Sequence, residues 1–257
     1  MSWRAVPVLL LFILLPFGPL AAQADMGDMP MGSQGEHGNT TPATADAAMM
    51  GHPMEGAHIR LTPAWPRSAG DQARADSVVA AARATLSRYQ DPQAAEADGY
   101  RRFAPGIKQQ KVYHYTRYAN AMRARFQFDP SRPTSLLYAP DADGSLKLIG
   151  AMYTMPAGAT PEQLNSRIPL SIAHWHLHTN VCLPPRPRPR PRPRDQATPA
   201  SFQGPGARFG PKGSIVTAEA CEDAGGHFFP VLFGWMVHVN MFAGDDPAAI
   251  WGSVRHL

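Results

Sequence analysis

Three histidines alternate with apolar residues in one short stretch, residues 173–182 (AHWHLHTNVC). On a β-strand, alternate side chains share a face, so His174, His176 and His178 would lie on one side and the apolar residues between them on the other. Neighbouring members would have Cα atoms about 6.6 Å apart, a span that two imidazoles can close onto one ion at about 2.0 to 2.1 Å from each nitrogen. The outer two would be about 13 Å apart. We therefore expect one His-x-His pair with further ligands from elsewhere.

A second strand is expected to supply the third ligand. Residues 234–241 (GWMVHVNM) alternate so that Met236, His238 and Asn240 share a face opposite an apolar one. His238 is the preferred third ligand, and His114, which follows Tyr113, is the next candidate. A histidine among tyrosines can equally be a core residue that donates one hydrogen bond. Candidate accessory groups are Asn180, Asn240 and Tyr113.

Histidine ligation favours Zn, Cu, Fe or Ni over Mg or Ca. The competing interpretation is a polar sheet face on which histidines pair with tyrosine or asparagine. The spacing of the histidines does not distinguish among Zn, Cu, Fe and Ni.

Residues 25–68 show no hydrophobic periodicity but hold half of the 12 methionines. Thioether sulfur is a soft ligand suited to Cu(I), imidazole binds Cu(II), and a flexible tail can gather both kinds of ligand around an ion. We therefore expect a disordered tail that captures copper, and the tail favours copper at the histidine site too. The alternative is an exported tail without function. The expected capture ligands are Met26, Met29, Met31, His37, Met49, Met50, His52, Met54 and His58.

Residues 1–24 have the features of an export signal. They carry a positive charge at Arg4, an apolar run over residues 6–20 and a small-x-small cleavage site at residues 22–24. Pro16 and Pro19 interrupt the apolar run, which is short for a membrane span. We expect signal cleavage, no membrane span afterwards, and a periplasmic or secreted protein.

The two cysteines, Cys182 and Cys221, are expected to form a disulfide, because export places them in an oxidising compartment. Free or metal-bound thiolates are the alternative. The bond would tie the histidine strand to a predicted helix that ends before Gly225.

Residues 69–257 are predicted to form a single α+β domain. Apolar side chains recur every three or four positions over residues 71–90, which predicts an amphipathic helix. Short β-like runs with short connections then predict an antiparallel sheet flanked by helices. The expected strands cover residues 111–118, 135–139, 146–155, 171–181 and 234–242. Brief helices are expected after Asp91-Pro92, Thr160-Pro161, Thr217 and Asp246-Pro247.

The formal net charge of +4 comes from one tract. Residues 185–194 alternate Pro and Arg, and without these five arginines the remaining charge is −1. Nucleic-acid binding is therefore not expected. The tract lies in a low-complexity loop over residues 184–212 and should be an extended polyproline II segment. It is a candidate contact for an envelope polyanion, and a low-complexity insertion without function is the alternative.

The sequence contains no Gly-x-Ser-x-Gly elbow, phosphate-binding loop, dinucleotide fingerprint or His-Glu-x-x-His motif. It therefore favours an exported metal-binding protein, with copper preferred over zinc or iron. One alternative is a mononuclear metalloenzyme in which the same three histidines leave an open coordination position. The other is an exported structural domain without metal.

Five short motifs lie within the predicted domain: YHYT at 113–116, DPxxPxxLLY at 129–138, GAMYT at 150–154, WHxHxNxC at 175–182 and FGWMxH at 233–238. Together they resemble an uncharacterised group of exported bacterial hypothetical proteins, over about residues 72–252. The resemblance implies that His176 and His178 are the pair and that His174 is the spare. It implies no activity, and the Pro-Arg tract departs from the pattern as an insertion in a variable loop.

Overall fold

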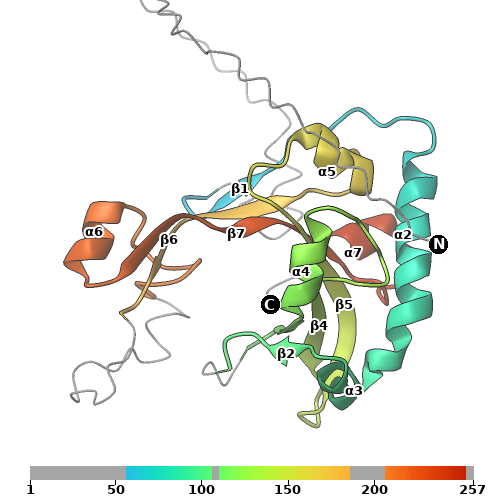
Figure 1. The fold of residues 1–257 in the computed structure, drawn as a ribbon, viewed down its shortest axis with the longest axis horizontal. Coiled ribbons are helices and arrows are strands. Elements are labelled where there is room, and N and C mark those ends of the chain that lie inside the picture. Colours follow the sequence, from blue (N-terminus) through green and yellow to red (C-terminus); the bar gives the residue numbers. More distant parts are fainter. Residues whose placement is uncertain (1–55, 106–109, 186–205, 253–257) are drawn as a thin grey trace, which may run out of the picture. The chain divides into compact units, whose positions relative to one another are not determined.

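The computed structural model describes residues 56–105, 110–185 and 206–252 (Figure 1), all within one compact unit. The predicted signal, residues 1–24, and the predicted capture ligands before residue 56 lie outside the described residues. The Arg residues of the Pro-Arg tract lie outside them too.

Seven strands form one antiparallel sheet in the order β1-β6-β7-β5-β4-β3-β2 (Figure 1), which confirms the predicted α+β class. The strands are β1 (Ile59–Leu61), β2 (Arg101–Arg102), β3 (Tyr113–Thr116), β4 (Ser135–Pro140), β5 (Leu146–Met155), β6 (His176–Leu183) and β7 (His227–Val239). Two predicted boundaries were wrong: β6 begins at His176 rather than residue 171, and β7 begins at His227 rather than residue 234.

Helices surround the sheet: α2 (Asp71–Leu86), η1 (Ser87–Gln90), α3 (Pro92–Ala97), α4 (Tyr118–Ala124), α5 (Pro161–Arg167), α6 (Ala218–Asp223) and α7 (Pro247–Trp251). The predicted caps of α3, α5, α6 and α7 are present, because the side chains of Asp91, Thr160, Thr217 and Asp246 each accept a backbone N–H of the first turn. Helix α4 was not predicted.

One face of the sheet packs against α2 and makes the main core. Val79 and Leu86 of α2 are buried in one cluster with Tyr138 of β4, Tyr153 of β5 and Val237 of β7. Figure 1 shows α2 running beside β4 and β5. Because strand side chains alternate, burying this set turns the residues between them toward the other face.

The predicted tail boundary at residue 68 was wrong. Residues Ile59–Leu61 form β1, an edge strand that pairs antiparallel with β6 and places Ile59 opposite His178 and Leu61 opposite His176. Residues 59–61 therefore belong to the sheet. Their backbone pairing holds one side of the histidine strand.

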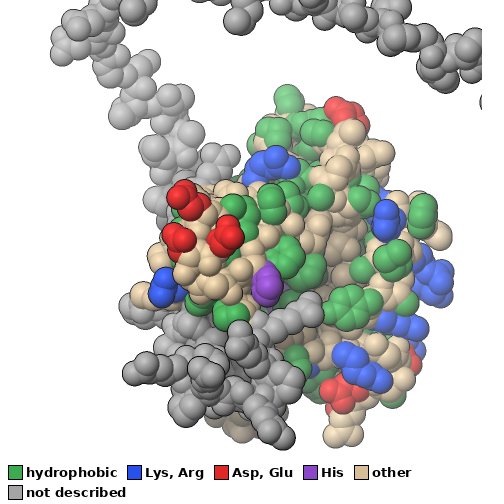
Figure 2. Space-filling view, turned by 60° about the vertical axis from the view of Figure 1, so that its left-hand side comes forward, with side chains coloured by type: hydrophobic (Ala, Val, Ile, Leu, Met, Phe, Trp, Pro, Cys, Tyr) green, Lys and Arg blue, Asp and Glu red, His purple; other side chains and the backbone are tan. Residues whose placement is uncertain are grey.

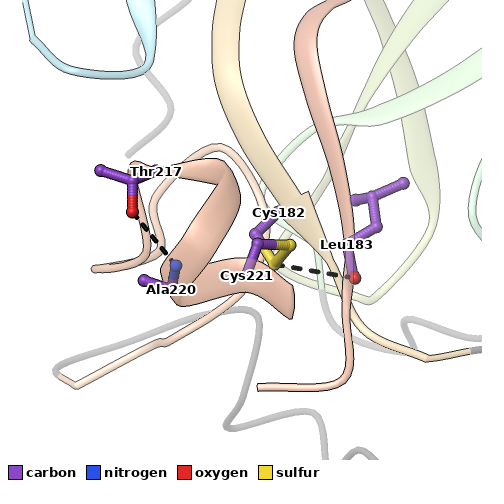
Figure 3. The surroundings of a disulfide bond; sticks show 5 residues. All are labelled: Cys182, Leu183, Thr217, Ala220 and Cys221. Carbon is purple, nitrogen blue, oxygen red and sulfur yellow. Dashed lines mark hydrogen bonds between the residues drawn. A yellow bond between two sulfur atoms is a disulfide. The ribbon is translucent and has the colours of Figure 1, made fainter. Parts of the chain in front are cut away.

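The predicted disulfide is present between Cys182 and Cys221, with Cα atoms 5.6 Å apart. It joins β6 to α6 (Figure 3), whose first turn is capped by the Thr217 hydroxyl accepting the N–H of Ala220. Gly226 passes close beside the bond, since a Cβ there would lie 2.6 Å from Cys182 Sγ. A glycine is therefore required where the chain turns from α6 into β7.

We expect the disulfide to stabilise the fold by limiting the freedom of the unfolded chain. The cysteines are 39 residues apart, and the chain-entropy relation gives roughly 3 to 4 kcal/mol for a loop of this size. Urea unfolding of the native protein with and without reductant should show a loss of this order. The Cys182→Ala/Cys221→Ala variant should start at the lower value and not respond to reductant. Equal stability of all three samples would contradict the prediction.

Asp71 fastens the start of α2 to the chain that precedes β6. Its buried carboxylate accepts the Ser68 N–H at 2.9 Å, the Ser171 hydroxyl at 2.6 Å and the Arg74 guanidinium at 3.0 Å. These bonds, that of Ser171 foremost, lower the pKa of Asp71 to about 2.

Because the folded-state pKa of Asp71 lies below its unfolded value, its contribution to stability is present above the unfolded pKa and is lost as pH falls toward about 2. The Asp71→Asn variant should melt at a lower temperature than the native protein at neutral pH. The difference should shrink on acidification, as thermal midpoints between about pH 5 and about pH 2 will show. Asp76→Asn, on the exposed side of the same helix, should keep the native pH profile. A difference for Asp71→Asn that is constant with pH would refute this role.

Candidate metal centre

Four histidines lie in a row on the sheet face opposite the main core. His114 comes from β3, His238 from β7, and His176 and His178 from β6. Ring centroids are 5.9 Å apart for His114 and His238, 5.1 Å for His238 and His176, and 5.4 Å for His176 and His178. We call these four residues the histidine row.

The histidine row exists because the sheet curls toward this face. Strand β3 is three strand spacings from β7, about 14 Å in a flat sheet, yet the rings of His114 and His238 are 5.9 Å apart. Gly150 of β5 permits a close approach by β7, since a Cβ there would lie 2.2 Å from the carbonyl oxygen of Val239. A side chain at this position would push β7 away from β5.

The ring separations suit shared metal binding. Two imidazoles that bind one tetrahedral ion through nitrogens about 2.0 to 2.1 Å away have ring centroids roughly 5 Å apart. His176 and His238 match this value best, at 5.1 Å, and His114 and His178 flank them on either side. In the present arrangement, no three His, Cys, Asp or Glu side chains among the described residues stand in ligand positions around one point. Closing on an ion therefore requires ring rotation.

The environment of His178 favours a neutral imidazole, and His238 in the same row is also buried. His238 is 8% exposed, and burial lowers the pKa of His178. The Nδ1 atom of His178 is buried without a hydrogen-bond partner. A neutral ring with an open nitrogen is the form that binds a metal ion, and a buried polar atom without a partner is otherwise costly.

A β-bulge in β7 lies beside the histidine row. One residue separates His176 from His178 on β6, whereas three separate their partners Met236 and Leu232 on β7. Within the bulge, Phe233 has a φ of +66°, a conformation unfavourable for a bulky side chain. Such strain persists only where surrounding structure enforces it, and it is common at functional sites.

The bulge turns Phe233 toward Phe103, which follows β2 at the far end of the sheet. The two rings meet edge to face with centroids 5.7 Å apart, and the Phe103 N–H donates to the carbonyl of His114 at 2.7 Å. Both side chains are partly exposed, Phe233 by 60%. Figure 2, which turns the β6–β7 end of Figure 1 forward, shows hydrophobic side chains exposed on that side. The aromatic pair therefore links the β2 end of the curled sheet to β7, next to the histidines.

Of the five predicted ligands, the structure brings together the four histidines of the row and separates His174 from them. His174 precedes β6, and its Nδ1–H donates to the Thr62 carbonyl at 3.1 Å. His58, predicted as a tail ligand, is buried with its ring nitrogens 3.2 Å and 2.6 Å from the carbonyl oxygens of Thr179 and Gly213. The tail assignment of His58 was therefore wrong.

The predicted accessory groups have other contacts. The amide of Asn180 donates to the Ala57 carbonyl, and that of Asn240 donates to the carbonyls of Ala249 and Gly252 at the end of α7. Tyr113 packs with the main core, on the face opposite His114. These residues hold the strands and helices in place.

Sequence spacing did not reveal the aromatic pair or the contact between His114 and His238. Both join residues that are more than a hundred positions apart in the chain. The clearest local signal was Gly150, because a glycine inside a strand marks a close backbone approach.

No known family model matches the chain, and comparisons with curated proteins and with solved structures give no match either. Within the described ranges, no helix has the length and apolar character needed to cross a membrane.

Replacing Gly150 by alanine should destabilise the curled sheet. The new Cβ would collide with the backbone of β7, so we expect a loss of about 1 to 3 kcal/mol in the free energy of unfolding, measured in urea. Gly158→Ala is the matched control, because a Cβ there meets nothing within 4 Å. If the two variants are equally stable, close approach at Gly150 does not hold the curl.

Proposed function

We propose that this protein is an exported transition-metal-binding protein, with copper the favoured metal and zinc or iron the alternatives. The observation that carries the proposal is the histidine row, in which imidazoles from β3, β6 and β7 have separations of 5.1 to 5.9 Å on one sheet face. A set of neutral nitrogen ligands suits these metals better than Mg or Ca.

In the proposed site, His176 and His238 bind the ion together, since their rings are nearest to each other. His178 or His114 completes the set by rotating its ring. The strands that carry them are fixed by pairing on both sides, so little order has to be created on binding.

The proposal that the protein is exported rests on two observations other than the histidine row. The predicted signal precedes the domain, and a Cys182–Cys221 disulfide is typical of proteins outside the reducing cytosol. We propose a periplasmic or secreted location, where the Met-rich tail captures copper and the histidine row holds it.

The test measures metal bound to the purified mature protein after equilibration with Cu or Zn(II), by elemental analysis. It uses a mature chain whose six tail methionines are leucine and whose tail histidines His37 and His52 are alanine, here called the tail-Leu protein, so that neither thioethers nor imidazoles of the tail contribute. We expect about one metal ion per chain, and loss of that ion in the His176→Ala/His238→Ala variant, because the central pair is removed.

His227→Ala is the matched control: this exposed histidine starts β7, outside the row, and the variant should keep its metal. Titration of unaltered tail-Leu protein with Zn(II), followed by imidazole NMR signals, gives a second readout that needs no substitution in the row. Retention of stoichiometric metal by the double variant, or absence of any Zn(II) or Cu effect on the row's signals, would overturn the proposal.

A further inference from the structure

Two methionines lie directly across the strands from the central histidines. Met236 of β7 pairs with His176 of β6, and Met152 of β5 pairs with His238 of β7. Directly opposed residues on antiparallel strands have Cβ atoms about 4.5 to 5.5 Å apart on the same face. Thioethers and imidazoles therefore alternate across three adjacent strands.

We infer that Met152 and Met236 are thioether ligands that take the place of the third histidine and, with His176 and His238, make this a Cu(I) site. The inference rests on the proposed function and specifies its metal and oxidation state. Cu(I) is the soft ion that combines thioether and imidazole ligands, whereas Zn(II) and Cu(II) gain less from thioethers.

The position of the two methionines supports a role beyond filling the main core. Both are buried, Met152 at 8% and Met236 at 5% exposure, but they pack in a small separate cluster with Val112 and Leu137. That cluster lies on the histidine face, away from α2. Unbranched methionine adapts its shape readily, so its sulfur can reach an ion without backbone movement.

The charge of the ion favours the same oxidation state. All four proposed ligands are neutral, so the ion brings its full charge into an apolar environment. Because the cost of burying an ion grows with the square of its charge, a monovalent ion meets about a quarter of the penalty of a divalent one. The buried position of Met152, Met236 and His238 thus disfavours Zn(II) and Cu(II) relative to Cu(I).

The test compares Cu(I) and Zn(II) affinities of the tail-Leu protein and its Met152→Leu/Met236→Leu variant. Cu(I) affinity is measured anaerobically by competition with bicinchoninate, and Zn(II) affinity by competition with a chromophoric chelator. Loss of a group that only supports a metal ligand lowers metal affinity roughly 10- to 100-fold. We therefore expect loss of the two thioether ligands to lower Cu(I) affinity by at least this factor and to leave Zn(II) affinity unchanged.

Met155→Leu is the matched control, because Met155 lies on the same strand and is equally buried, but in the main core. It should keep native Cu(I) affinity. X-ray absorption of Cu(I)-loaded tail-Leu protein provides a measurement that needs no further variant, and sulfur scatterers should appear beside nitrogen.

The outcomes separate the two proposals. If His176→Ala/His238→Ala loses both metals while Met152→Leu/Met236→Leu keeps Cu(I) affinity, or if Cu(I) shows nitrogen scatterers alone, the thioether inference is overturned and the histidine site stands. If the histidine variant keeps both metals, the proposed function itself fails.

Discussion

The curl of the seven-stranded sheet is the constraint on which the rest of the structure depends. It brings β3 near β7 although two strands lie between them, so that His114 and His238 come into ring contact. Gly150 allows the required approach of backbone to backbone. Phe103, which follows β2, contacts Phe233 of β7, although β2 lies one strand farther from β7 than β3 does. A flat sheet of the same strands would leave these side chains separated.

One face of the sheet forms the hydrophobic core that stabilises the fold, and the other face carries the proposed metal site. The face against α2 is filled with large apolar and tyrosine side chains, as a stable core requires. The other face combines a small apolar cluster with the histidine row. Because strand side chains alternate, one set of residues fixes the other: burying Val237 on the core face directs Met236 and His238 to the opposite face.

The histidine strand β6 is held from several directions. Strand β1 pairs with its start, β7 pairs along its length, and the disulfide at Cys182 fastens its end to α6. The bulge that contains Phe233 interrupts this regular pairing beside His176 and His178. A strained residue within otherwise firm pairing is typical of a site whose geometry is maintained at some cost in stability.

The sequence alone determined the α+β class, most strand positions, the helix caps and the Cys182–Cys221 pair, because alternation, capping residues and a single possible pairing are local or countable signals. It also predicted which histidines to consider. Only the tertiary structure decided that His176 and His238 are the central pair of the row, and that Met152 and Met236 lie directly across the strands from them. It also decided that His58 is buried and that residues 59–61 join the sheet. Those relations depend on strand order, register and curl, which are set by packing of the whole sheet and not by the spacing of residues along the chain.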